Sequence, residues 1–150
     1  MIPALNQSLP TMSESARAQV KAFETCVLNA PQTDMITKHV IHAGMYVRTI
    51  MLPAGHVLTG AHIKIPTIVT VCGDVDVFTG ESVMGLRGYH VLPAQEGRKQ
   101  AFYAHTDTYI SMAFPTQAST VEDAEVEFTD EHAALMSRRG KNEILTRGIL

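Results

Sequence analysis

The middle of the chain, residues 39–115, consists of short runs of β-forming and apolar residues separated by turn signals. Residues 45–52 are rich in β-formers and end at a Pro-Ala-Gly break. Residues 67–72 are mostly apolar, and residues 75–78 alternate between apolar and polar positions. We expect a turn at 73–74 between these two runs. About eight such runs, with turn signals about every 8 to 12 residues, predict a β-sandwich or barrel.

The N-terminal zone has a helical period instead. Ala16, Val20, Phe23 and Val27 recur at spacings of three and four, which predicts one apolar face on a helix near residues 13–29. This face needs cover, either from the barrel or from a neighbouring subunit. Val20, Phe23 and Val27 are therefore candidates for an interface.

The C-terminal zone starts with a cluster of acidic residues and continues with basic ones, the order that the helix dipole favours. It predicts a helix near residues 120–137. Phe128 lies on the apolar stripe of this helix and is a fourth interface candidate. Residues 143–150 are interpreted as a final strand or an extended tail. We interpret the charge run as mainly structural.

These zones divide the chain into a helical arm at 1–38, a β-barrel at 39–115, and an acidic helix with a tail at 116–150. A length of 150 residues is typical of one structural domain, so we expect the three zones to share one core.

Composition narrows the functional classes. A net charge of -3 argues against a nucleic-acid binder, and no apolar run has the length of a membrane span. The N-terminus lacks the pattern of a secretory signal. Charged residues make up 18% of the chain, below the roughly 25% of soluble domains, which predicts a homo-oligomer that covers part of its surface. Cys26 and Cys72 are expected to be reduced and buried.

Three stretches of the middle zone occur in a familiar order. Residues 48–56 form a strand that leads into a glycine turn, residues 60–77 include His62 and a Gly-Asp hairpin, and residues 88–97 contain a proline–glycine turn. Together they resemble the motifs of cupins. The resemblance implies a mainly β, cupin-like jelly roll, or double-stranded β-helix barrel, of about eight strands with an N-terminal and a C-terminal helix.

Longer stretches extend this likeness over most of the chain. Residues 42–49, 97–102, 114–116 and 121–131 resemble small cupin-like proteins of tailed bacteriophages and prophages. This resemblance implies a fold and a genomic setting but no particular reaction. The localisation it implies is the bacterial host cytoplasm during infection, and then the virion.

In the metal-binding cupins that the chain resembles, the ligands are a His-x-His pair, a following Glu and a further His. This chain departs from that pattern. Lys64 stands where the second histidine of His62-Ile63-Lys64 is expected, and no glutamate follows. Because a protonated lysine repels a cation, we predict no metal and no other cofactor. The alternative is one divalent transition metal held by His56, His62 and His105.

Basic residues suggest a second kind of site. Lys64, Arg98 and Lys99 are candidates for binding an anionic ligand at the barrel mouth. Adjacent side chains on a strand face opposite ways, so only one of Arg98 and Lys99 can point into the barrel. The competing interpretation is one solvated cation and one cation paired with the acidic helix.

No catalytic residue is predicted, because the sequence has no nucleophile motif, P-loop or dinucleotide fingerprint. The leading hypothesis is a non-enzymatic phage accessory protein, namely a virion component such as a capsid decoration or tail-associated subunit. Its partners would be copies of itself and other phage structural proteins, with no nucleic acid or membrane. The alternatives are a metal-dependent cupin enzyme acting on a small molecule and an anion-binding module.

Overall fold

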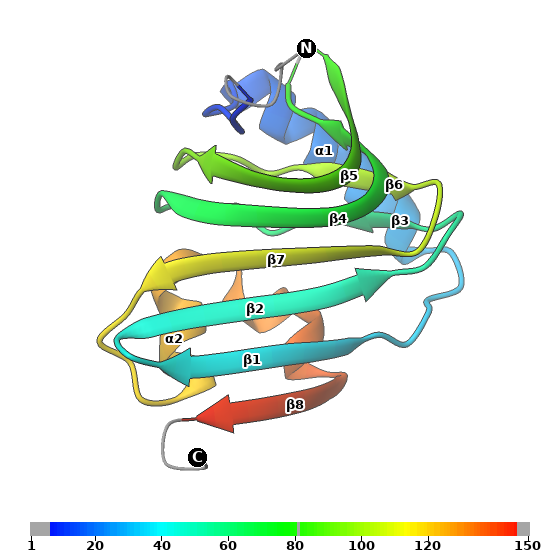
Figure 1. Cartoon of the computed structure of the whole chain (residues 1–150). Coiled ribbons are helices and arrows are strands. Elements are labelled where there is room, and N and C mark those ends of the chain that lie inside the picture. The colour runs from blue at the N-terminus through cyan, green and yellow to red at the C-terminus, as the bar shows by residue number, and fades with distance from the viewer. Residues whose placement is uncertain (1–6, 81, 147–150) are drawn as a thin grey trace.

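A computed structural model describes residues 7–80 and 82–146, in which one curled sheet carries helices near both ends of the chain (Figure 1). The mainly β fold with about eight strands and two helices is confirmed. The strands are β1 (Ile36–His42), β2 (Met45–Leu52), β3 (Val57–Thr59), β4 (Thr67–Phe78), β5 (Val83–Ala94), β6 (Ala101–Ala104), β7 (Thr108–Pro115) and β8 (Lys141–Thr146). The helices are α1 (Glu14–Leu28) and α2 (Val121–Phe128), followed by the 3-10 turns η2 (His132–Ala134) and η3 (Met136–Arg138).

The sheet curls because β4 changes partner along its length. The strand order is β3-β6-β4-β7-β2-β1-β8, and β5 pairs with the other edge of β4. The first half of β4 pairs with β7 and the second half pairs with β6, whereas β5 follows it throughout. Every pairing is antiparallel except that of β1 with β8. The result is a half-barrel whose inner face is covered by the C-terminal segment.

The prediction of a turn at 73–74 is wrong, because strand β4 continues through these residues to Phe78. Gly73 has a φ of 151°, and it pairs with Gly88 of β5, which has a φ of 85°. A Cβ atom on Gly73 would lie 2.8 Å from the Cα atom of Thr108, so glycine is needed where β7 begins. The expected turn at 73–74 is therefore a bend inside one long strand, and Gly88 lies opposite it in the other. The eighth strand lies in the tail instead, and residues 147–150 of that tail fall outside the described residues.

Helix α1 confirms the helix expected near 13–29. Its N-cap is Ser13, whose side chain accepts a hydrogen bond from the Ala16 N–H. Ala16 and Val20 are buried and form a small cluster with Met12, packed against Phe78 and Ala101. The barrel thus covers the first half of the predicted apolar face.

Helix α2 is shorter than the helix expected at 120–137. It ends at Phe128, where the backbone of Thr129 becomes extended. Two bonds favour this end: the Phe128 carbonyl accepts from the Lys64 N–H, and the Thr129 hydroxyl accepts from the Glu131 N–H. The chain then continues through η2 and η3 across the open side of the half-barrel.

The main core lies inside the curl, and a second cluster joins α2 to β2 and β7 through Phe128, Tyr46 and Phe114. Cys26 and Cys72 are both free and exposed, so their predicted burial is wrong. Each lies on an outward-facing position of α1 or β4, and apolar neighbours in sequence did not reveal this orientation. No helix among the described residues is long and apolar enough to cross a membrane.

Candidate functional site

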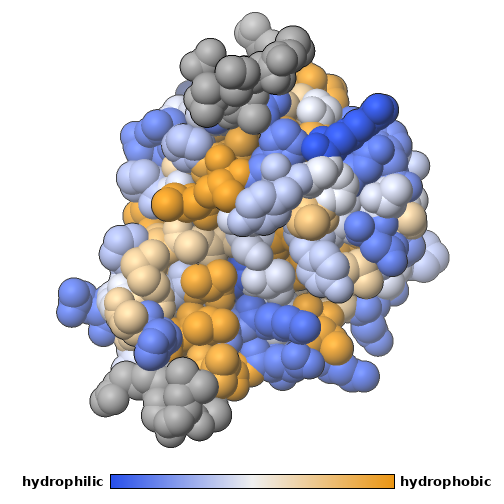
Figure 2. Space-filling model, viewed as in Figure 1, coloured by the Kyte–Doolittle hydropathy of each residue, from blue (hydrophilic) through white to orange (hydrophobic). Residues whose placement is uncertain are grey.

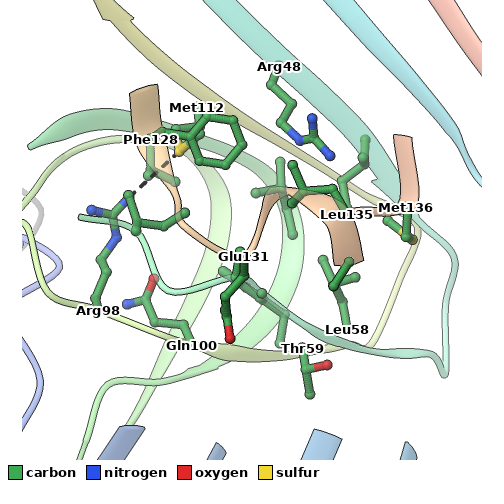
Figure 3. A pocket seen from close by; sticks show the side chains of 18 of the residues that line it. Arg48, Leu58, Thr59, Arg98, Gln100, Met112, Phe128, Glu131, Leu135 and Met136 are labelled. Carbon is green, nitrogen blue, oxygen red and sulfur yellow. Dashed lines mark hydrogen bonds between the residues drawn. The ribbon is translucent and has the colours of Figure 1, made fainter. Parts of the chain in front are cut away.

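A cavity of about 180 Å³ lies between the curled sheet and the segment that runs from Phe128 to Met136 (Figure 3). Its walls are mainly apolar because strands β2, β4 and β7 turn alternate side chains inward. The large apolar lining residues are Ile50, Leu58, Ile63, Val69, Phe102, Ile110, Met112, Phe128, Leu135 and Met136. Arg48, Arg98, Gln100 and Glu131 are the main polar groups on this lining.

Arg48, on β2, belongs to a cluster of charged and polar side chains that bond to one another. Its guanidinium donates to Glu125 at 3.0 Å and to the Ser137 hydroxyl at 3.1 Å, and it lies 5.6 Å from the centre of the Phe128 ring. Arg138 donates to the other oxygen of Glu125 at 2.6 Å. The Ser137 hydroxyl also donates to Glu125. The cluster ties β2, α2 and η3 together.

The charge of Glu125 is stabilised although its side chain is only 1% exposed. Burial acts to raise the pKa of Glu125, but hydrogen bonds from Ser137, Arg138 and Arg48 outweigh burial and hold the pKa below its ordinary value. Two arginines and a hydroxyl therefore satisfy this buried carboxylate.

Arg98 lies at another part of the cavity and is 2% exposed. Its guanidinium donates to the Gln95 carbonyl at 2.6 Å and to the Thr67 hydroxyl at 2.7 Å, and it approaches the Met112 sulfur at 3.9 Å (Figure 3). Its Nε–H has no partner within the described chain. Burial lowers the pKa of Arg98 to about 10, so the group remains cationic at neutral pH.

Lys99 faces away from Arg98, as strand alternation predicts, and does not line the cavity. Its ammonium group donates to Glu24 of α1 at 3.2 Å, to Glu131 at 3.1 Å and to the Gly60 carbonyl at 2.8 Å. Lys21 lies 3.4 Å from the same two carboxylates. Glu24 and Glu131 line the cavity, so this network forms part of its rim.

Burial acts to raise the pKa of Glu131, but the His62 N–H and the nearby lysines lower it on balance. The expected pairing of one cation with the acidic segment therefore applies to Lys99. The expected solvation of the other cation is wrong, because the fold buries Arg98 against the cavity.

The structure does not bring the other candidates together. Lys64 is partly exposed and pairs with Asp130 at 2.7 Å, outside the cavity lining. His56 bonds to the Thr33 hydroxyl, and His105 bonds to Asp76. The backbone N–H of His62 donates to Glu131. Over residues 7–80 and 82–146, no group of three or more His, Cys, Asp or Glu side chains could hold a metal ion, so the residues present do not fit the cupin metal set.

The interface candidates differ in accessibility. Val20 and Phe128 are 2% and 1% exposed because they pack within this chain. Val27 is half-buried, and Phe23 is 43% exposed. The apolar surface that α1 leaves exposed is thus on its second half.

Sequence reasoning missed Arg48 and Gln100 as cavity residues. The spacing could have indicated Gln100, because residues 98 and 100 on an extended segment share a face. Nothing local singled out Arg48, since its carboxylate partner lies 77 residues away.

Comparisons with known proteins concern the fold. No protein-family model matches the chain, and no curated protein matches it. Among solved structures, it is similar to a double-stranded β-helix protein from Klebsiella pneumoniae, with 16% identity and a TM-score of 0.47 over 61% of this chain and 85% of that one. A further similar structure is an RmlC-like cupin from Desulfovibrio desulfuricans, with 19% identity and a TM-score of 0.42 over 59% of this chain and 91% of the other.

An oxalate oxidase in complex with glycolate is also similar, at 15% identity and a TM-score of 0.42, over 51% of this chain and 44% of that protein. This chain therefore spans less than half of the oxidase. At such identities the likeness carries no argument about activity, and the site is interpreted from the residues of this chain alone.

Proposed function

We propose that this chain is a binding module for a compact, mainly apolar small molecule held in the cavity of the half-barrel. The observation that carries the proposal is the cavity of about 180 Å³ with its apolar walls. An apolar cavity of about 150 Å³ in another protein binds benzene, so this space suits a body of similar size. Binding sites of this kind combine apolar walls with a few placed polar groups.

The half-barrel supports a preformed site. Ile50, Val69 and Ile110 come from three neighbouring strands of one hydrogen-bonded sheet, and Phe128 and Leu135 close the space from the other side. The ion cluster around Glu125 holds this covering segment onto β2. A ligand would therefore meet walls whose positions the fold already determines.

The test is binding of toluene, a neutral apolar probe, followed by the rise in melting temperature and by NMR. Ile110→Phe adds volume inside the cavity, and Val83→Phe adds the same ring to an exposed position on β5. We expect toluene to stabilise the parent protein and Val83→Phe but not Ile110→Phe. Leu58→Phe, at a half-buried lining position, serves if Ile110→Phe does not fold. Toluene that fails to bind the parent protein, or that binds the filled variants equally well, contradicts the proposal.

A second candidate function is assembly with other copies of this chain, and the outer face of the sheet favours it. Over residues 89–93 of β5, 68–72 of β4, 109–113 of β7 and 47–51 of β2, the outward positions hold no charged side chain, so two copies could meet there without burying charge. The charged pair Asp74 and Arg87 lies beyond this patch, further along β4 and β5. Figure 2 shows hydrophobic and pale side chains gathered along this face between hydrophilic flanks. The outward residues are Tyr89, Val91 and Pro93, Cys72, Thr70 and Ile68, Tyr109, Ser111 and Ala113, and Met51, Thr49 and Val47.

The mass of the protein in solution tests this assembly. We expect a dimer, and we expect Thr70→Glu, at the centre of the face, to convert it into a monomer. Glu122→Gln, on the exposed side of α2, is the control. A monomeric parent protein contradicts the proposal. Membership of a phage virion rests on the sequence resemblance alone and stays a prediction, which mass spectrometry of purified particles can test.

A further inference from the structure

Two side chains with unpartnered N–H groups face the same end of the cavity. Arg98 and Gln100 are two residues apart just before β6, so they project to the same side of an extended segment, while Lys99 projects to the other. Figure 3 shows the two side chains near each other, and Arg48 at a different end of the cavity. This end differs in charge from the rest of the mainly apolar wall.

The positive charge of Arg98 has no counterpart within the described residues. The contacts of its guanidinium are a carbonyl, a hydroxyl and a thioether, which are all neutral, and no carboxylate of the described chain forms an ion pair with it. Burying an unpaired charge is costly, and most buried charges have a partner of opposite sign. Arg98 therefore leaves this end of the cavity with one positive charge and an unused Nε–H donor.

Gln100 adds a second unused donor. Its side chain is 5% exposed, and its Nε2 amide group has no hydrogen-bond partner within the described chain. Buried donors are nearly always paired, so a missing partner is informative. Two donors and a positive charge together match a group that offers two acceptor oxygens and one negative charge.

We infer that the cavity binds a monocarboxylate with a compact apolar body, whose carboxylate contacts Arg98 and Gln100. This inference rests on the proposed function, since it requires the cavity to be a ligand site. The cavity volume suits an apolar body of about six to eight non-hydrogen atoms, by comparison with the cavity of about 150 Å³ that holds benzene.

The acidic groups on the rim do not oppose this anion. Glu24 and Glu131 line the cavity, but Lys99 and Lys21 each lie within 3.4 Å of both carboxylates. The two acids and two lysines balance in charge. Arg48 forms an ion pair with Glu125, a carboxylate that it shares with Arg138. Of the charged side chains that line the described cavity, Arg98 is therefore the one without an ion-pair partner.

The experiment compares benzoate with benzamide, which has the same ring and nearly the same shape but no charge. Dissociation constants are measured for the full chain by calorimetry at neutral pH. We expect benzoate to bind at least about tenfold more tightly, because hydrogen bonds to charged groups are stronger than neutral ones. We also expect benzoate to shift the NMR signal of the Arg98 Nε–H group.

Substitutions test whether the preference for benzoate over benzamide depends on Arg98 and Gln100. Arg98→Met keeps a long apolar stem and removes the charge, and we expect it to abolish the preference for benzoate while toluene still binds. Gln100→Leu should reduce the preference in part. Arg87→Met is the matched control, because Arg87 is exposed and does not line the cavity. If Arg98→Met does not fold, the parent protein's preference and the Arg98 Nε–H shift still decide the question.

The outcomes separate this inference from the function on which it rests. Toluene binding without a preference for benzoate over benzamide overturns the carboxylate inference and leaves the cavity as a binding site. A benzoate preference that survives Arg98→Met also overturns it. If none of the three probes binds the parent protein, the proposed function fails, and the inference fails with it.

Discussion

Arg48, which is half-buried, and Arg98, which is buried, both lie on the lining of one cavity, but their surroundings differ. Arg48 lies 3.0 Å from Glu125, which also binds Arg138 and Ser137. Arg98 is more deeply buried, and its described partners are all neutral. Arg48 forms its ion pair within the chain, whereas Arg98 has a positive charge and an unpartnered Nε–H group that a ligand could bind.

This comparison shows how buried charges can be sorted into structural and functional ones. A buried ion whose partners all lie within the chain holds elements together, as Glu125 does for β2, α2 and η3. A buried ion without a counter-charge weakens the fold by its desolvation and is expected where a ligand supplies the missing charge. Four measurements can break or sharpen the distinction.

Replacing Glu125 should have the largest effect. Glu125→Gln leaves the charges of Arg48 and Arg138 without their buried partner, and we expect the free energy of unfolding to fall by about 3 kcal/mol. Urea unfolding measures this change. Glu122→Gln, one turn earlier on the exposed side of α2, loses only a favourable interaction with the helix dipole, so the free energy of unfolding should fall by about 0.5 kcal/mol or less. A small effect of Glu125→Gln would remove the contrast between the two arginines.

Replacing Lys99 should have an intermediate effect. Lys99→Met removes the buried ammonium group that holds Glu24 and Glu131 together, and we expect a loss of about 2 kcal/mol in urea unfolding. The loss is smaller than for Glu125 because both carboxylates are partly exposed and keep Lys21. The control is Lys21→Met, at an exposed position, with a loss of about 0.5 kcal/mol or less. Equal losses in the two variants would contradict the assigned role of Lys99.

Replacing Arg98 should change the stability of the ligand-free protein little. Arg98→Met loses two hydrogen bonds, but it also removes the cost of a buried charge and leaves no described carboxylate unpaired. We expect a change within about 1 kcal/mol in either direction. A loss as large as that of Glu125→Gln would show that Arg98 is a structural residue.

The smallest effect should be a dependence of stability on mildly acidic pH. His39 is 1% exposed, and burial lowers its pKa below the ordinary 6.5. The unfolded chain therefore takes up a proton more readily than the folded one. This contribution to stability is fully present above pH 6.5 and is lost as the pH falls through the lower folded-state pKa.

Urea unfolding at pH 7.5 and at pH 5.5 measures the His39 effect, and His39→Gln should reduce the difference between them. Glu125 and Glu131 also have lowered pKa values, but their contributions are lost only at more acidic pH, below about 4.5. An unchanged pH dependence in His39→Gln would assign the effect to another group.

Local sequence predicted the elements well where periodicity decides them. The apolar spacing of Ala16 and Val20 predicted α1, and the Pro-Ala-Gly break predicted the end of β2 at Leu52. It misplaced a turn inside β4, because Gly73 and Asp74 have the composition of a turn. Only the close approach of Thr108 shows that Gly73 serves a bend inside a strand.

The candidate site was predicted only in part. Strand alternation required Arg98 and Lys99 to face opposite ways, which the structure confirms. It could not say which of the two faces the cavity, because the register of this segment depends on its pairing with residue 63. The side chains of His56 and His105, proposed as part of an alternative metal set, bond to Thr33 and Asp76 and form no metal-binding group among the described residues. The sequence could not show this, because both partners are distant along the chain.

The sequence by itself determined the mainly β character of this protein, its first helix and the alternation of side chains along each strand. These properties depend on neighbours a few residues apart. Tertiary structure decided where the charges find partners: Glu125 meets Arg48 across 77 positions of chain, and Arg98 meets no described carboxylate at all. Electrostatic pairing acts through space, so a charge's function follows from the fold that surrounds it.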